Sequence, residues 1–417
     1  MIVLAGADLV LPGGVQLEGT LVIDGERIVD IQPGGMGGMG AVHLRGHVVL
    51  PGFIDVHVHG LDGLDTLDGG NAIAGIAERL PKFGVTAFCP TTVACVPHAL
   101  REVLQSVAAL RADSTKGLPT VAASAANRGL PTVAAAAAKV GARVLPAHLE
   151  SNFINPEYRG AQPIACLRSP LGAIGAMGVG DFDGRDILAE IEIAGDSVGI
   201  VTLAPELDGA LDLIRRLVSS GRRVSLGHSG ATLAQARAAI EAGARHATHL
   251  FNRMPPLSHR EPGLAGAILT SAEVAAEIIC DGVHVHRDMV RMAIATKGAA
   301  RMMAITDGVA AAGLSEGSTA SLGGRTIRVR NSAAYLEDGT LAGSVATMDR
   351  VFRFLINDVG LSLHDGAQLC ASTPGSELGL TDLGSIVKGA IADLVVMDRD
   401  LTVKQTYIGG RLVYSAM

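Results

Sequence analysis

The chain has 417 residues, 48% of them hydrophobic, so it can bury a large core and hold one large domain beside a smaller module. Its formal net charge of −7 argues against nucleic acid as a partner, because such a partner requires concentrated Lys and Arg. With no Trp and 3% aromatic residues, it also lacks a broad stacking platform for long sugars or bases. We therefore expect a small ligand that is held by hydrogen bonds and a metal.

The hydrophobic and cysteine patterns indicate a soluble protein. No apolar run reaches the roughly 18 residues that a membrane helix needs, and the first ten residues lack the basic stretch of a signal peptide. The five cysteines are scattered without CxxC spacing, so we expect buried free thiols rather than disulfides or a thiolate zinc site. These features predict a cytoplasmic location and no membrane partner.

Both ends of the chain carry short β-like runs. Residues 1–50 contain four such runs separated by turn signals, and residues 392–413 contain two more. We expect the two ends to form one small β-sandwich domain, from residues 1–50 and 379–417. The glycine-rich segment 34–40 lacks the following Lys-Ser/Thr and helix of a phosphate loop, so it is expected to be a hairpin connection.

The central residues 51–378 alternate between strand and helix patterns. Helical spacing of apolar residues marks 208–219, 233–242 and 347–357, and such alternation predicts a (β/α)8 barrel of the TIM type. The repeat GLPTVAA at 117–123 and 129–135 is expected to be a small duplication within a helical excursion, without chemistry. The eight strand-like segments are residues 53–58, 85–89, 143–148, 199–203, 223–226, 246–250, 276–280 and 302–306.

Side chains that bind metals recur at the ends of these segments. His57 and His59 alternate along the first segment, while Glu150, His228 and His249 follow three others. Any one of them alone would be an ordinary core or surface residue. Because the carboxyl ends of barrel strands meet at one rim, the set predicts one shared site for a divalent metal. Histidines beside a carboxylate resemble a zinc site with an open water position.

Two further residues are candidates for catalysis. Asp307 ends the eighth segment, where a carboxylate can take a proton from an activated water and return it to a leaving amine. A metal lowers the pKa of its water from about 15.7 towards about 7, so no Ser or Cys nucleophile is required. His284, in the segment DGVHVH, can donate to a carbonyl oxygen as charge develops there, or can simply line a polar loop.

These residues lie in motifs that resemble the amidohydrolase superfamily and, within it, the N-acetylglucosamine-6-phosphate deacetylase family. The resemblance spans almost the whole chain and keeps the motifs in the family's order. They are PGFIDVHVHG (51–60), HLE with FINP and RGA (148–161), LAPE (203–206), GHSGAT (227–232), HATHLFNRM (246–254), HREPGLAGA (259–267), DGVHV (281–285), ITDG (305–308), LAGS (341–344) and GAIADLVVMD (389–398).

The resemblance implies an enzyme that removes the acetyl group of an amino-sugar phosphate. It implies Glu150, His228 and His249 as main metal ligands, and the first-strand histidine pair as ligands of a second ion. One or two ions remain open, with zinc expected first and iron or manganese as alternatives. Asn252 and Arg260 match phosphate-binding residues, with Arg260 reaching in from the neighbouring subunit of a homodimer. His284 matches the histidine that binds the carbonyl and the sugar.

Three departures from the family bear on sugar recognition. Ser151 and Asn152 replace Gly-Pro in the family's HLEGPF, Gln162 replaces a histidine that contacts the sugar, and Arg253 replaces a small residue. Gln162 and Arg253 are therefore candidate substrate-binding residues. The alternatives are a related N-acyl amino sugar such as N-acetylgalactosamine 6-phosphate, or an N-acyl amino acid or cyclic amide. A non-catalytic scaffold is disfavoured, because no expected metal ligand is lost.

Overall fold

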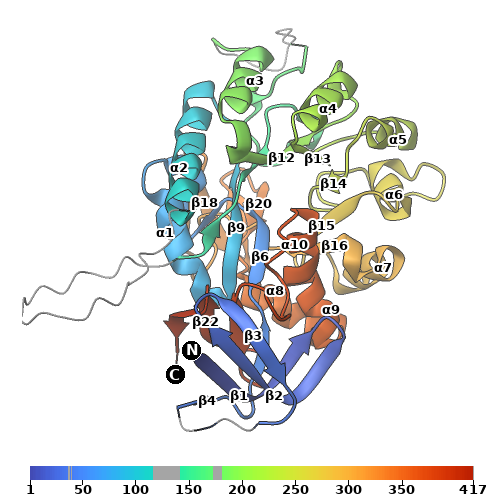
Figure 1. The fold of residues 1–417 in the computed structure, drawn as a ribbon. Coiled ribbons are helices and arrows are strands. Elements are labelled where there is room, and N and C mark those ends of the chain that lie inside the picture. The colour runs from blue at the N-terminus through green and yellow to red at the C-terminus, as the bar shows by residue number, and fades with distance from the viewer. Residues whose placement is uncertain (36–37, 39, 116–140, 172–180, 417) are drawn as a thin grey trace, which may run out of the picture.

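The central part of the chain forms a nearly closed parallel barrel (Figure 1). The computed structural model describes residues 1–35, 38, 40–115, 141–171 and 181–416. Val58 pairs with Gly308 where the first and last strands meet. The hydroxyl of Thr306 donates a hydrogen bond to the Asp55 carboxylate across the same junction. This arrangement confirms the predicted barrel. Its strands are β6 (Phe53–Val58), β9 (Val85–Thr92), β10 (Arg143–Val144), β11 (Ala147–Glu150), β12 (Val198–Leu203), β13 (Arg223–Leu226), β14 (His246–Ala247), β15 (Ala275–Ile279) and β16 (Met302–Ile305).

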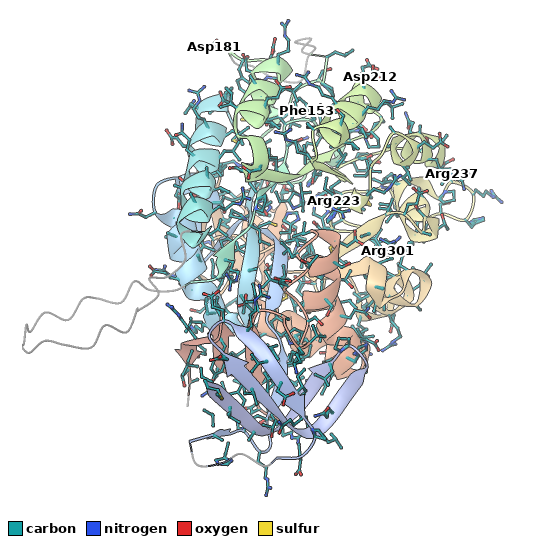
Figure 2. The ribbon with its side chains drawn as sticks, in the orientation of Figure 1. Phe153, Asp181, Asp212, Arg223, Arg237 and Arg301 are labelled. Carbon is teal, nitrogen blue, oxygen red and sulfur yellow. The ribbon has the colours of Figure 1, made fainter. Side chains whose placement is uncertain are left out.

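Helices surround the strands (Figure 1), and amphipathic ones such as α4 and α7 bury one apolar face. In α4, Leu213, Ile214 and Leu217 are buried, whereas Asp212 of α4 and Arg237 of α5 point outward (Figure 2). The helices are α1 (Ala72–Arg79), α2 (Pro97–Thr115), α3 (Gly184–Ile193), α4 (Ala210–Ser219), α5 (Leu233–Glu241), α6 (Gly263–Thr270), α7 (Arg287–Lys297), α8 (Met348–Phe354), α9 (Leu363–Ala367) and α10 (Thr373–Glu377).

Several barrel strands differ from their predicted extents, and β9 runs three residues further than predicted, while the third and sixth strands differ for clear physical reasons. The third is divided into β10 and β11 around Pro146, because proline has no N–H to donate to a neighbouring strand. The sixth ends at Ala247, because the backbone turns at His249, which has a φ of 27°. That turn carries the His249 side chain to the rim of the barrel.

The two ends of the chain form one sheet below the barrel (Figure 1). β5 pairs antiparallel with β21, so Leu50 lies opposite Val395 and the N-terminal strands join the C-terminal ones. This pairing confirms a β domain built from both termini, while its exact boundaries stay a prediction. The strands are β1 (Ile2–Leu11), β2 (Gly14–Asp24), β3 (Arg27–Gln32), β4 (Val42–His43), β5 (Val48–Pro51), β21 (Leu394–Met397), β22 (Val403–Ile408) and β23 (Arg411–Ser415).

A four-stranded antiparallel sheet follows the last barrel strand and was not predicted. It contains β17 (Thr319–Leu322), β18 (Arg325–Arg330), β19 (Ala333–Leu336) and β20 (Leu341–Ser344). In β18, Ile327 and Val329 are buried while their neighbours face outward, so the alternation TIRVR was the available signal. Leu322 of β17 and Leu341 of β20 line the cavity that is described below.

Three further predictions concern the cysteines, membrane-spanning helices and two repetitive segments. All five cysteines lie in the described part of the chain and carry free thiols, four of them buried. Within the same residues, no helix combines the length and hydrophobicity needed to cross a membrane. The repeat at 117–123 and 129–135 lies outside the described residues, as do three positions of the glycine-rich segment.

Candidate metal centre

Three predicted ligands converge on one point at the carboxyl end of the barrel. The Oε1 atom of Glu150 lies 2.9 Å from Nε2 of His228 and 2.8 Å from Nε2 of His249. The two imidazole nitrogens are 3.1 Å apart. Glu150 ends β11, and the histidines follow β13 and β14, so three separate strands bring these atoms together.

The hydrogen bond behind His228 fixes which ring nitrogen faces the site. Its Nδ1 lies 2.8 Å from the backbone oxygen of Tyr158, which can only accept, so Nδ1 carries the proton. In the neutral ring, Nε2 then keeps a lone pair directed at Glu150 and His249. This is the arrangement that a histidine needs in order to bind a cation.

A second group lies directly beside the first. Nε2 of His57 is 3.1 Å from Nε2 of His59, and each lies 3.3 Å from Oδ1 of Asp307. Glu150 lies between the groups, with its oxygens 3.6 Å from His57 and 3.5 Å from His59. Each group has three donors close enough to share one ion.

Glu277, which was not predicted from the sequence, lies beneath the metal centre and orients its histidines by hydrogen bonds. It is fully buried in β15 and accepts from Nδ1 of His57 at 2.8 Å, so Nε2 of His57 is left to face the second group. Its other oxygen lies 2.8 Å from Nε2 of His246. A lone acid within the apolar run AAEII was the signal that could have revealed it.

The buried carboxylates of the centre favour a positive charge beside them. Burial opposes a positive charge on His57, yet Glu277 and Asp307 outweigh it and raise its pKa to about 9. Burial likewise opposes charge on His59, and Asp307 with Glu150 raises its pKa to about 10. The buried carboxylates therefore favour positive charge among them, and a divalent cation between neutral imidazoles supplies it. The residues fit a metal site.

Several residues of the centre have strained backbone. The φ angle is 49° at His228, 27° at His249, 53° at Arg253 and 47° at Asp307, all in the left-handed region that residues with a Cβ rarely adopt. Such conformations cost about 1–3 kcal/mol each and cluster at functional sites. All four residues line one cavity of 490 Å³.

His284 lines the same cavity and is held by Asp281. Its Nδ1 lies 2.6 Å from Oδ2 of Asp281, so the proton on Nδ1 is shared with a carboxylate. Burial opposes a charge on the ring, but this hydrogen bond outweighs it and raises the pKa of His284. The protonated ring can donate from Nε2 to a group in the cavity.

The candidate substrate-binding residues lie in different places. Gln162, Asn252 and Arg253 line the cavity, and the buried Nδ2 of Asn252 has no hydrogen-bond partner among the described residues. Arg253 donates to the backbone oxygen of Leu341 at 3.1 Å. Arg260 is exposed on the loop that precedes α6 and is not part of the cavity wall of its own chain.

The barrel with histidine and carboxylate donors at its carboxyl end defines a class of metal-dependent hydrolases. The model of the family described as "Amidohydrolase family" matches residues 48–413, so the chain belongs to the amidohydrolase family. Members of that superfamily depend on divalent metals, and the clusters described here can hold one.

Within this family, the chain is similar to several N-acetylglucosamine-6-phosphate deacetylases. N-acetylglucosamine-6-phosphate deacetylase from Rattus norvegicus is 38% identical over 89% of this chain and 84% of its own. The Bacillus subtilis enzyme of that name is 33% identical over 88% and 85%. A solved variant from Mycobacterium smegmatis, in complex with N-acetyl-D-glucosamine-6-phosphate, has a TM-score of 0.84 and 30% identity, covering 99% of both chains.

Proposed function

We propose that the protein hydrolyses N-acetylglucosamine 6-phosphate to glucosamine 6-phosphate and acetate. The observation that carries this proposal is the convergence of Glu150, His228 and His249 beside Asp307 in one cavity. The relatives that carry this activity in their names match most of the chain. A solved neighbour binds the proposed substrate.

In this proposal, Glu150, His228 and His249 hold the main divalent ion, and His57 and His59 can hold a second. The ion supplies Lewis-acid activation of water and of the acetyl carbonyl. Histidine and carboxylate donors suit zinc, while iron and manganese are the alternatives. Free, mostly buried cysteines are consistent with the proposed cytoplasmic location.

Asp307 is the proposed general base and acid. Burial opposes its ionised form, but His57 and His59 outweigh burial and hold its pKa below the usual range, so it starts as a carboxylate. It can therefore accept the proton of the attacking water and return it to the amine nitrogen as the amide bond breaks. His284 donates to the acetyl oxygen as negative charge develops there.

The phosphate is proposed to lie against Asn252, Arg253 and Arg260. Asn252 offers an unused amide donor, and a guanidinium matches a phosphate dianion with two parallel N–H groups. Because Arg260 is exposed on its own chain, it is proposed to complete the site of the neighbouring subunit in a homodimer.

A second candidate substrate is N-acetylgalactosamine 6-phosphate. Arg253 adds bulk and charge to the cavity wall, and Gln162 uses its amide within the protein, so the sugar meets different groups from those of the family. An N-acyl amino acid or cyclic amide would need no phosphate-binding residues.

A substrate panel tests these alternatives. Metal-loaded protein is assayed against N-acetylglucosamine 6-phosphate, its galacto epimer and the unphosphorylated sugar. We expect kcat/KM to be highest for N-acetylglucosamine 6-phosphate. Equal kcat/KM with and without phosphate would refute the phosphate site, and faster turnover of the epimer would replace the proposed substrate.

A further inference from the structure

Gln162 is tied to the metal ligand Glu150 by a defined amide orientation. The side chain is buried, and its Oε1 accepts from the backbone N–H of Ala94 at 2.7 Å. Since a backbone N–H only donates, the amide oxygen must face Ala94 and the NH2 group must face the other way. That NH2 group donates to Oε2 of Glu150.

This contact gives the two oxygens of Glu150 different partners. Oε1 faces His228 and His249 at 2.9 and 2.8 Å. Oε2 accepts from Gln162 and lies 3.5 Å from His59 of the second group. A carboxylate that bridges two cations uses both oxygens, and a donor on Oε2 competes with a cation for the same lone pairs.

A second residue that departs from the family supports the position of Gln162. Asn152 donates to the backbone oxygens of Cys95 and Cys166 at 2.7 and 2.6 Å. Cys95 follows Ala94 directly, and Cys166 lies on the same loop as Gln162. The segments that orient the amide are therefore held against the end of β11, which carries Glu150.

We propose that Gln162 is a positioning residue that directs Glu150 to a single cation through Oε1. The group of Glu150, His228 and His249 then binds a divalent ion more tightly than the group of His57, His59 and Asp307. The inference deepens the proposed function and concerns its metal site, but it is measured by metal binding alone. A failure of the substrate assignment would leave it standing.

The test titrates protein stripped of metal with Zn²⁺ against a competing chromophoric chelator. Bound zinc is counted by mass spectrometry of the metal. Gln162→Met keeps the size of the side chain but removes the donor, whereas Gln162→His can still donate. Glu157→Gln is the matched control, because Glu157 lines the same cavity on its exposed side without contacting Glu150. Circular dichroism checks that each variant is folded.

For the wild type we expect one tight ion and a second bound at least about 10-fold more weakly. Loss of an outer partner of a ligand typically costs about 10–100-fold in metal affinity, so Gln162→Met should weaken the first ion by that factor. The affinities of the two ions should also converge in this variant. Gln162→His and Glu157→Gln should bind the first ion as the wild type does.

Two results would overturn the proposal. One is wild-type protein that takes up two zinc ions with equal affinity. The other is a folded Gln162→Met variant that binds its first ion as tightly as the wild type. If Gln162→Met does not fold, a Gln162→His variant with the first-ion affinity reduced 10-fold or more would contradict the assigned donor role.

Discussion

The barrel interior has opposite chemistry at its two ends. Near the strand starts it is apolar, with Ile54, Leu145 and Met303 buried beneath Leu378. At the strand ends it is crowded with imidazoles and carboxylates, which are also buried. The same strands therefore carry a packed core that closes the sheet and a charged rim that needs a cation. Stability and activity should respond to changes at different ends.

Substitution of Asp307 at the charged rim should change activity more than any other substitution considered below. Asp307→Asn removes the carboxylate that is proposed to transfer the proton, and such groups contribute about 10²–10⁴-fold, so kcat should fall by that factor. The ion at Glu150, His228 and His249 should stay bound, because Asp307 is not among the donors of that group, and the melting temperature should stay close to wild type. Steady-state kinetics measures kcat, metal analysis measures the bound ion, and thermal denaturation measures the melting temperature. A variant that keeps most of its turnover would refute the role of Asp307.

At the apolar end, Met303→Ala should reduce stability rather than catalysis. Removing a fully buried Met side chain typically costs about 2–5 kcal/mol of the free energy of unfolding. Urea denaturation measures this loss, and KM at a temperature where the variant is folded serves as the control. A large change in KM with unchanged stability would show that the two ends are not separable.

Glu277 is buried in β15 beneath the charged rim and accepts a hydrogen bond from His57. Glu277→Gln leaves Nδ1 of His57 without a carboxylate acceptor. The second ion should then bind about 10–100-fold more weakly, as for other partners behind metal ligands. Zinc titration measures the affinity. Unchanged binding of both ions would mean that Glu277 serves packing alone.

The smallest effect is expected at the outer wall of the cavity. Arg253→Ala should raise KM for a phosphorylated substrate by roughly tenfold, the equivalent of one modest charged contact. KM for the unphosphorylated sugar should not change. Arg237→Ala, on the outer face of α5 (Figure 2), is the control for general loss of charge. Equal effects on both sugars would place Arg253 away from the phosphate.

The sequence predicted most of the barrel because each strand is a separate apolar run followed by a helical pattern. The rim could be predicted for the same reason, since His228 and His249 follow such runs. Glu277 was missed because a single acid inside a strand gives no periodic signal. The bond from Gln162 to Glu150 depends on a loop conformation that local sequence does not determine.

The most direct test is a crystal structure of the zinc-loaded protein with anomalous scattering recorded at the zinc edge. We expect a peak about 2.0–2.2 Å from Oε1 of Glu150 and from Nε2 of both His228 and His249. A peak that contacts none of these three atoms, in crystals with bound zinc, would contradict the proposed metal site.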